Sequence, residues 1–455
     1  MNGPSAHGER TSQHDNLLGR TRAVLPSWLA IYYDEPIEIE RGEGRYVWTD
    51  DGTRYLDFFG GILTTMTAHA LPEVTKAVAD QAGKIIHSST LYLNRPMVEL
   101  AEQIAAVSAI PDAKVFLTTS GTEANDAALL LASSLRRSNQ ILALRNSYHG
   151  RSFSTIAITG NRSWSPTSLS PFQTYYVHGG QRYRSPFAGL SDGEFIAACV
   201  ADLRDVLDQS GGDVAALIAE PIQGVGGFTH GPDGLLGALA EVLREHGILI
   251  IADEVQTGWG RTGEHFWGWQ AHGFTPDIVT FAKGVGNGLS MGGVIARAEV
   301  MDSLGANSIS TFGGSPLTSA GALANLRYLL DHDLQANAAR HGPVLIEGLR
   351  ALGSPIVGDV RGKGLMIGVE LVRPGTGTPG DPAPELAAAV LEATKRRGLL
   401  VGKGGLHGNV LRIAPPMTLT ADEATEGLTA LIAAIREVDG GLAAGAPTTD
   451  EEITA

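Results

Sequence analysis

The pattern of apolar and polar positions divides the chain into a short β-rich start, a long alternating middle and a mixed end. Residues 37–61 alternate apolar and polar side chains around an Asp-Gly turn, which predicts a small antiparallel hairpin. From about residue 62 to 315, short β-rich runs alternate with stretches rich in Ala and Leu. This alternation predicts βα units and a mostly parallel sheet covered on both faces. Helical patterning continues through 317–334, and an α+β segment follows.

We therefore expect an α/β protein with one large domain and a small α+β domain built from both ends of the chain. Residues 1–24 are polar and are interpreted as a flexible arm, and the tail 441–455 is predicted to be disordered because it is low in apolar residues. The remaining boundaries are 25–61 and 321–440 for the two parts of the small domain and 62–320 for the large domain.

Composition and charge exclude several classes of protein. A chain of 455 residues with 43% hydrophobic residues can bury a large core, which excludes a disordered chain, a disulfide miniprotein and a collagen-like rod. The chain has 34 Lys and Arg against 49 Asp and Glu, a net charge of −15. An acidic chain without a basic run has no electrostatic footprint for nucleic acid or for anionic lipid.

The single cysteine and the N-terminus suggest a cytoplasmic protein. Cys199 cannot form an internal disulfide, and it lies in an apolar stretch where an inert buried thiol is expected. The N-terminal residues lack the apolar region of a signal peptide, and no apolar run approaches the roughly 18 residues of a membrane helix.

Five predicted strands are each followed by a polar residue that is a candidate for ligand binding or catalysis. Since ligands bind at the carboxyl ends of strands in an open parallel sheet, these groups are expected to converge. The five segments are 114–119, 140–150, 214–224, 247–258 and 277–288.

The first of these strands runs into a predicted helix start. Ser120 followed by Glu123 forms the sequence pattern of a capping box. The pattern is explained by helix capping alone, but Gly121 and Thr122 also allow backbone N–H groups and a hydroxyl to face a phosphate at the positive end of the helix.

Two further strands lead to Tyr148 with His149, and to Glu220. An aromatic residue there can pack on the rim of the sheet or stack on a flat cofactor ring. Glu220 is either exposed at its strand end or paired, because an unpaired buried carboxylate is costly.

Asp253 follows a run of apolar residues typical of a buried central strand. A carboxylate there can be a loop cap or a metal ligand, but no His or Cys cluster with ligand spacing accompanies it. The alternative partner is a cation within a ligand, such as a protonated pyridine nitrogen.

Lys283 follows the strand of segment 277–288. A lysine desolvated in a pocket has a lowered pKa, so its free amine can attack a carbonyl and form a Schiff base. The glycines after Lys283 resemble part of a dinucleotide fingerprint, but their spacing does not match it.

Six motifs in order carry a family resemblance: SGTEAND, YHGRS, EPIQG, DEVQTGWGRTG, the AKG lysine box and TFGG. With them the chain resembles the class III, pyridoxal-phosphate-dependent aminotransferases of fold type I. The resemblance is strongest to the alanine–glyoxylate aminotransferase 2-like branch. It covers residues 36–320 and extends to 411–420. It implies a seven-stranded sheet in the large domain, pyridoxal 5'-phosphate as cofactor, and a homodimer or tetramer with shared active sites.

The resemblance also assigns roles to particular residues. Lys283 would carry the cofactor as a Schiff base and then move the substrate proton, while Asp253 would keep the pyridine nitrogen protonated. Tyr148 and Val255 would cover the two ring faces, and Gln256 would bind the ring hydroxyl. The catalytic set is Lys283, Asp253 and Tyr148, and the cofactor-binding set is Ser120, Gly121, Thr122, Tyr148, His149, Glu220, Asp253, Val255, Gln256, Lys283 and Thr311.

Three of these assignments reach beyond the cofactor ring. Thr311 would reach the phosphate from the partner subunit, and Glu220 would support the site from behind the cofactor. Arg412 matches the arginine that binds a substrate carboxylate.

Departures from the family pattern bear on the substrate. Relatives acting on ω-amines commonly have Glu at the position of Val225, where it masks the arginine in one half-reaction. Here Val225 cannot pair with Arg412, so we expect a donor with its amine near a carboxylate, such as alanine or a β-amino acid. The broader expected donor class also includes ω-amino acids, and the expected acceptor is a 2-oxo acid such as pyruvate, glyoxylate or 2-oxoglutarate. Ser315 replaces the Asn that is usual in this branch, and AHALPEV at 68–74 lacks the usual GHxHP motif, so the substrate can differ from that of the relatives.

Two alternatives stay open at this point. A decarboxylase or aminomutase of the same fold begins with the same cofactor chemistry, and the cofactor motifs do not separate it from an aminotransferase. A nucleotide-binding module would have to use the glycines of 284–288 or 401–408, which lack a full fingerprint, and it leaves Lys283 and Asp253 without a shared purpose.

Overall fold

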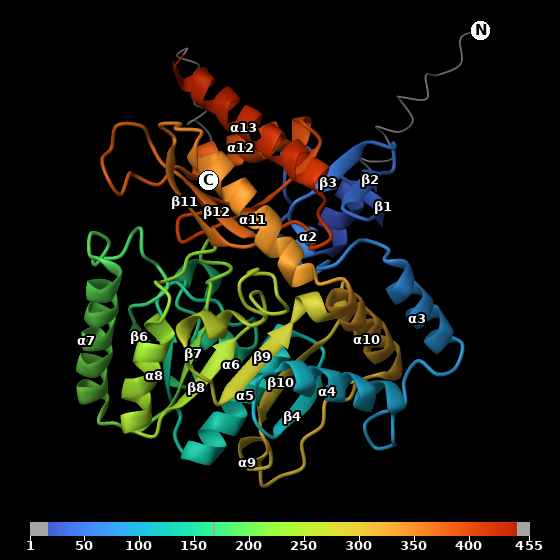
Figure 1. Ribbon diagram of the computed structural model, residues 1–455, viewed down its shortest axis with the longest axis vertical. Coiled ribbons are helices and arrows are strands. Elements are labelled where there is room, and N and C mark those ends of the chain that lie inside the picture. The colour runs from blue at the N-terminus through green and yellow to red at the C-terminus, as the bar shows by residue number, and fades with distance from the viewer. Residues whose placement is uncertain (1–16, 167–168, 444–455) are drawn as a thin grey trace.

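The protein is described here from a computed structural model, which covers residues 17–166 and 169–443. Figure 1 shows a larger domain below and a smaller one above it. Within those two ranges, none of the helices has the length and apolar character needed to cross a membrane.

A seven-stranded sheet forms the centre of the large domain. Its order is β4-β10-β9-β8-β7-β5-β6, and β10 runs antiparallel to both of its neighbours while the other pairs are parallel. The sheet is therefore mostly parallel, as the sequence predicted. Its strands are β4 (Ala113–Thr118), β5 (Gln140–Leu144), β6 (Gln173–Val177), β7 (Val214–Ala219), β8 (Leu249–Asp253), β9 (Ile278–Ala282) and β10 (Gly292–Arg297).

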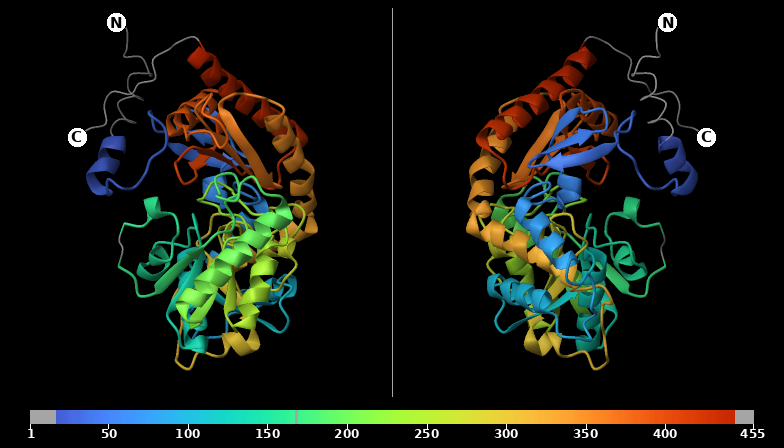
Figure 2. Two further views of the ribbon diagram at one scale, coloured as in Figure 1. Left: turned by 90° about the vertical axis from the view of Figure 1, so that its left-hand side faces the viewer. Right: turned by 90° about the vertical axis from the view of Figure 1, so that its right-hand side faces the viewer.

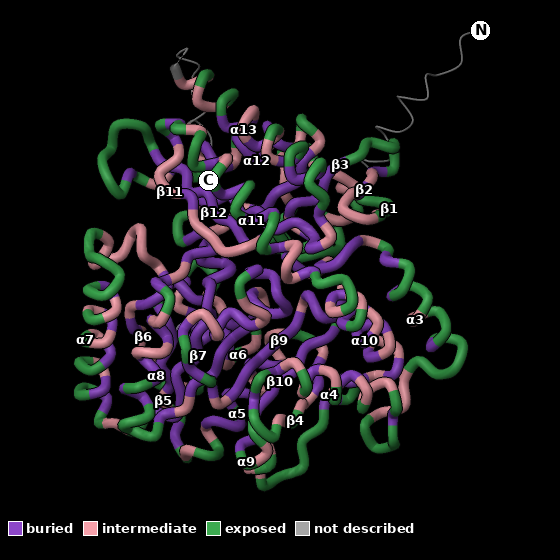
Figure 3. The backbone as a smooth tube through the Cα atoms, in the orientation of Figure 1, coloured by how far each residue is buried: buried purple, intermediate pink, exposed green. Residues whose placement is uncertain are grey.

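Helices cover both faces of this sheet, and the apolar side chains of its inner strands divide between two clusters. In β5, Ile141 and Ala143 pack with Ala128 of α5 (Gly121–Arg136), whereas Leu142 packs in the cluster that holds Leu203 of α7 (Asp192–Ser210). Burial on both faces explains the nearly continuous apolar runs of these strands. Figure 3 shows the same contrast, with buried central strands and outer helices that alternate buried and exposed turns. The other helices of this domain are α3 (Pro72–Ala82), α4 (Arg95–Val107), α6 (Phe153–Ala157), η1 (Arg162–Trp164), α8 (Leu235–Glu245), η2 (Gly268–His272), η3 (Lys283–Gly286), α9 (Ala298–Met301) and α10 (Pro316–Asp331).

Both ends of the chain build the small domain. Its first sheet has the order β1-β2-β3-β13, in which β13 from the C-terminal half pairs in parallel with β3. The second sheet has the order β11-β12-β15-β14. In the side views of Figure 2 the strands from the two chain ends lie next to each other above the large domain. The elements are β1 (Ile39–Glu43), β2 (Tyr46–Thr49), β3 (Arg54–Asp57), α2 (Gly60–Leu63), α11 (Leu334–Arg350), β11 (Val357–Lys363), β12 (Met366–Leu371), α12 (Pro384–Arg396), β13 (Leu399–Leu400), β14 (Gly402–Gly404), β15 (Val410–Ile413) and α13 (Ala421–Ala443).

The ends of the chain differ from their sequence-based interpretation. Residues 17–24 form a helix, so this part of the expected flexible arm has regular structure, and residues 1–16 lie outside the described ranges. Helix α13 continues to Ala443, three residues into the tail that was predicted to be disordered, and 444–455 are not described. Helix α10 packs against α3 and α4, so the large domain extends to about residue 331.

Candidate active site

The carboxyl ends of β4, β5, β7, β8 and β9 meet around a cavity of about 180 Å³. Of the site residues expected from the sequence, only Thr311 and Arg412 are absent from its lining. The lining consists of Ser120, Gly121, Thr122, Asn125, Tyr148, His149, Gly150, Glu220, Asp253, Val255, Gln256 and Lys283.

The N-terminus of α5 forms one wall of the cavity. The Ser120 hydroxyl accepts a hydrogen bond from the backbone N–H of Glu123 at 3.2 Å, as in a capping box. The carboxylate of Glu123, however, accepts from the backbone N–H and the hydroxyl of Thr119 at 2.8 and 2.7 Å rather than from Ser120. The reciprocal half of the expected box is thus displaced by one residue. Free N–H groups in the first turn of a helix form a site for anions such as phosphate.

Asp253 is 3% exposed at the end of β8 and is held in a defined orientation. Its Oδ2 accepts from Asn125 Nδ2 at 2.8 Å and lies 2.8 Å from His149 Nδ1. Within the described part of the chain, the one hydrogen bond to its Oδ1 is long, 3.2 Å, and comes from the backbone N–H of Val255. The carboxylate can therefore accept a further hydrogen bond from a protonated group in the cavity.

Lys283 directly follows β9, and its Nζ donates to the carbonyl oxygen of Ile62 at 3.2 Å. Burial lowers the pKa of Lys283 to about 8, and the charge of Arg412 acts in the same direction, while Asp253 and Glu220 oppose the shift. Because the pKa is lowered, a larger fraction of this amine is uncharged near neutral pH than for an exposed lysine.

The turn that receives Lys283 is strained. Gly60, Gly61, Ile62 and Leu63 all have φ between 54° and 68°, a left-handed conformation that is unfavourable for Ile and Leu. Asp57 holds the entry to this turn, since its Oδ1 accepts from the backbone N–H groups of residues 59 and 60, both at 2.9 Å. Strain of this kind clusters at functional sites.

Glu220 connects two loops behind the cavity. Its Oε1 accepts from the backbone N–H of Tyr148 and its Oε2 from that of Gly224, both at 2.8 Å. Burial raises the pKa of Glu220, and the neighbouring His149 opposes the shift. Tyr148 itself packs edge-on against Trp164, with ring centroids 5.5 Å apart.

Arg412 lies on β15 of the small domain and reaches the cavity through Gln256. Its Nη2 donates to Gln256 Oε1 at 2.9 Å, and its guanidinium lies 5.2 Å from the ring centre of Phe59 and 4.7 Å from that of Phe228. Burial lowers the pKa of Arg412 to about 10, so it remains charged at neutral pH. Within residues 17–166 and 169–443, no carboxylate forms a salt bridge with it.

Thr311 is exposed on the loop between α9 and α10 and does not contact the cavity of its own chain. The adjacent Ser310 does contribute locally, because its hydroxyl donates to Glu123 Oε1 at 2.5 Å. The expected role of Thr311 in a partner's site stays a prediction.

Sequence reasoning missed several supporting residues. Asn125 lies within the recognised SGTEAND motif and joins Asp253 to the carbonyl oxygen of His149, at 2.7 Å from the latter. Glu254 points away from the cavity and accepts from the backbone N–H groups of Gly268 and Trp269 at 2.9 and 2.7 Å. Burial raises the pKa of Glu254 to about 7.

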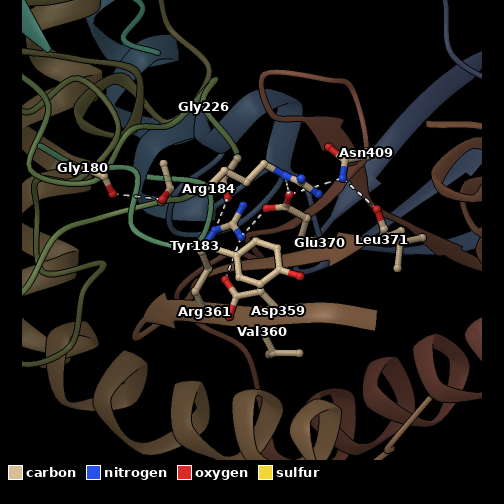
Figure 4. A network of polar contacts seen from close by, with 12 residues as sticks. Gly180, Tyr183, Arg184, Gly226, Asp359, Val360, Arg361, Glu370, Leu371 and Asn409 are labelled. Atoms are coloured by element: carbon tan, nitrogen blue, oxygen red, sulfur yellow. Dashed lines mark hydrogen bonds and ion pairs between the residues drawn. The ribbon is translucent and has the colours of Figure 1, made fainter. Parts of the chain in front are cut away.

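A buried ionic network joins Arg184, Arg361 and Glu370 (Figure 4). Glu370 of β12 accepts from Arg184 and from Arg361 Nη1, the latter at 2.7 Å. Arg361 Nε in turn donates to the carbonyl oxygen of Gly227 at 3.1 Å. Gly227 precedes Phe228, whose ring packs on Arg412, so the network connects the small domain to the wall of the site.

A lysine after a central strand, a buried acid facing the same cavity and a helix start suited to a phosphate define a fold-type I pyridoxal-phosphate enzyme. The family model "Aminotransferase class-III" matches residues 31–435, and the chain belongs to this family.

Curated and solved relatives agree with this membership. The chain is 39% identical to alanine–glyoxylate aminotransferase 2 homolog 2, mitochondrial, of Arabidopsis thaliana, over 93% of this chain and 86% of that protein. An (S)-enantioselective omega-transaminase from Thermomicrobium roseum superposes with a TM-score of 0.86 at 34% identity, covering 93% of this chain and 98% of that one. An amine transaminase from an uncultivated Pseudomonas species, solved in its PLP-bound (internal aldimine) form, gives a TM-score of 0.85 at 32% identity, covering 91% and 98%. The protein is a pyridoxal-phosphate-dependent aminotransferase.

The residues of the cavity fit this cofactor. A Cβ atom on Gly121 would lie 2.9 Å from Val255 Cγ1, and one on Gly150 would lie 2.7 Å from Thr122 Oγ1. Neither glycine therefore has room for a side chain, and two such positions in the cavity lining beside the start of α5 suit a phosphate held by backbone N–H groups. The free acceptor capacity of Asp253 suits a protonated ring nitrogen, and the lowered pKa of Lys283 suits attack on an aldehyde.

Proposed function

We propose that this aminotransferase moves an amino group from a small amino acid, with its amine near a carboxylate, to a small 2-oxo acid. The observation that carries the proposal is the buried Arg412, which stays charged, has no acidic partner among the described residues, and touches the cavity through Gln256. A charged guanidinium in that position favours a bidentate carboxylate ligand.

The residues around the cavity have separate tasks in this proposal. The first turn of α5, with Gly121 and Thr122, would hold the phosphate, and Tyr148 and Val255, which also line the cavity, would enclose the ring. Asp253 would keep the ring nitrogen protonated. When bound, the cofactor supplies an electron sink for the bond that breaks at the substrate carbon.

Lys283 is the group that binds the cofactor and moves a proton at its Nζ. A pKa of about 8 suits this task, because a general base works best when its pKa lies near the operating pH. The carbonyl oxygen of Ile62 accepts a hydrogen bond from this amine at 3.2 Å, and Lys283 lines the cavity.

The lack of an acidic partner for Arg412 determines the class of substrate. Val225 is apolar and buried, and its carbonyl oxygen accepts from the N–H of Gly405 at 2.9 Å, so it offers Arg412 no charge. The donor and the acceptor then meet the same cationic site in both half-reactions. This favours donors resembling alanine, a β-amino acid or an ω-amino acid, and acceptors such as pyruvate, glyoxylate or 2-oxoglutarate.

We also propose a homodimer, in which Thr311 serves the partner's site. Ile309 and Phe312 on either side of Thr311 are exposed, as are Leu91 and Tyr92. Ile309 also lines a groove of about 550 Å³ with Met97 and Val98 of α4. An apolar surface of this kind is typical of a protein interface, and a second copy of the chain would bury it and bring Thr311 to a second cavity. Tetramer formation and a cytoplasmic location stay predictions.

A single-turnover experiment with the purified enzyme and a panel of amino acids tests the function. A transaminase converts the cofactor to its pyridoxamine form and releases one 2-oxo acid per site. A decarboxylase would release CO₂, and an aminomutase would return the same carbon skeleton rearranged. Turnover restricted to amines without a carboxylate would contradict the role given to Arg412.

A further inference from the structure

The polar group that contacts Arg412 is a neutral amide. Gln256 Oε1 accepts from Arg412 Nη2 at 2.9 Å, while the aromatic rings of Phe59 and Phe228 flank the guanidinium. Among the residues that the structure describes, none forms a hydrogen bond with Arg412 Nε. The guanidinium of Arg412 is thus held in place by two aromatic rings and one amide, and it can donate further hydrogen bonds.

Gln256 is packed so that it stays between Arg412 and the cavity. A Cβ atom on Gly224 would lie 2.3 Å from the Cδ of Gln256, which shows how closely the amide lies over this glycine. Gly224 is itself fixed by its bond to Glu220 at 2.8 Å. Gln256 also lines the cavity that holds Lys283, so the amide touches both the arginine and the reaction space.

Building on the proposed function, we propose that Gln256 is a neutral mask for Arg412 and thereby determines substrate specificity. Its amide oxygen satisfies the guanidinium while no carboxylate is present, and a substrate carboxylate displaces it. When the substrate lacks a carboxylate, Gln256 keeps its contact with Arg412.

The physical reason is the difference between the two acceptors. A buried guanidinium without a partner is costly, so some acceptor must be present in the empty site. A carboxylate brings a full opposite charge and two parallel hydrogen bonds to a guanidinium, whereas the amide of Gln256 offers a single neutral acceptor oxygen. The amide therefore gives way to a carboxylate, whereas a carboxylate built into the protein would compete with it on equal terms.

The test replaces the neutral amide of Gln256 by a carboxylate of the same shape. In Gln256→Glu, a carboxylate oxygen takes the place of Oε1 beside Arg412. Binding of propionate, a carboxylate that has no amine and cannot react, is measured on the holoenzyme by isothermal titration calorimetry. We expect at least tenfold weaker binding than in the wild type, or about 1.4 kcal/mol. Gln173→Glu adds the same charge at the exposed first residue of β6 and should bind propionate like the wild type.

A second variant tests whether Gln256 competes with the substrate carboxylate for Arg412 or helps to bind that carboxylate. In Gln256→Leu the amide is gone, so in holoenzyme whose cofactor content matches the wild type by absorbance, propionate should bind as tightly as in the wild type or more tightly. Wild-type affinity in Gln256→Glu would overturn the proposal. Loss of binding in Gln256→Leu would also overturn it, because Gln256 would then assist the carboxylate rather than compete with it.

Failure of this inference is distinguishable from failure of the proposed function. Borohydride reduction that attaches a pyridoxyl group to Lys283, together with transamination of carboxylate donors, would leave the function standing even if both variants behaved unexpectedly. In Arg412→Lys, propionate binding should fall strongly, since a lysine cannot offer a bidentate fork. Unchanged binding in Arg412→Lys would overturn both the mask and the carboxylate site.

Discussion

A single methyl group at the start of α5 should weaken cofactor binding. In Gly121→Ala the new Cβ would lie 2.9 Å from Val255 Cγ1 and 3.0 Å from Cγ2, distances that real Cβ atoms do not tolerate without movement. Either the first turn of α5 or Val255 must shift, and both line the cofactor cavity. Overpacking of this kind costs about 1–3 kcal/mol.

If that cost falls on the bound state, the dissociation constant of pyridoxal phosphate rises by about fivefold to over a hundredfold. The assay is a reconstitution titration of cofactor-free protein, followed by absorbance. Gly193→Ala is the matched control, because Gly193 lies in the first turn of α7 and a Cβ there meets nothing within 4 Å.

A double variant tests whether the collision is the cause. Val255→Ala removes both Cγ atoms, so Gly121→Ala with Val255→Ala should recover cofactor affinity relative to Gly121→Ala alone. The reasoning is refuted if Gly121→Ala binds the cofactor like the wild type, or if Val255→Ala adds to the defect.

Three further predictions concern charge. Arg412→Ala should raise KM for carboxylate-bearing donors at least tenfold while slowing a minimal amine far less, and steady-state kinetics with both substrates would contradict the assignment if the effects were equal. Glu370→Gln should lower the free energy of unfolding by about 3–5 kcal/mol in urea titrations, because it leaves buried Arg184 without its acid and Arg361 with Asp359 alone. Glu245→Gln, in an exposed pair with Arg204, should have a much smaller effect. Since the pKa of Lys283 is lowered to about 8 in the folded, cofactor-free protein from 10.5, that protein should gain stability as pH rises from about 8 toward 10.5, and Lys283→Met should lack this gain.

Much of the site could be predicted because its residues are encoded locally. Lys283 and Asp253 each directly follow or end an apolar strand, and the direction of parallel strands brings such ends together. The helix start at Gly121 is equally local, since Ser120 is its N-cap. The detail of the capping box was wrong by one residue, because Thr119 supplies both an N–H and a hydroxyl to Glu123.

The remaining features depend on contacts between distant parts of the chain. Gln256 and Arg412 are 156 positions apart, and Arg361 lies 134 positions from Gly227. Neither pair has a sequence pattern that indicates its contact. The left-handed turn that places Ile62 beside Lys283 was also invisible, because apolar residues at positive φ are favoured only by the surrounding fold.

The most direct test of the account is reduction of the purified enzyme with borohydride, followed by peptide mapping. The account predicts a pyridoxyl group on the Nζ of Lys283, the amine whose pKa is lowered at the end of β9. Absence of any pyridoxyl adduct, or an adduct on a different lysine, would contradict it.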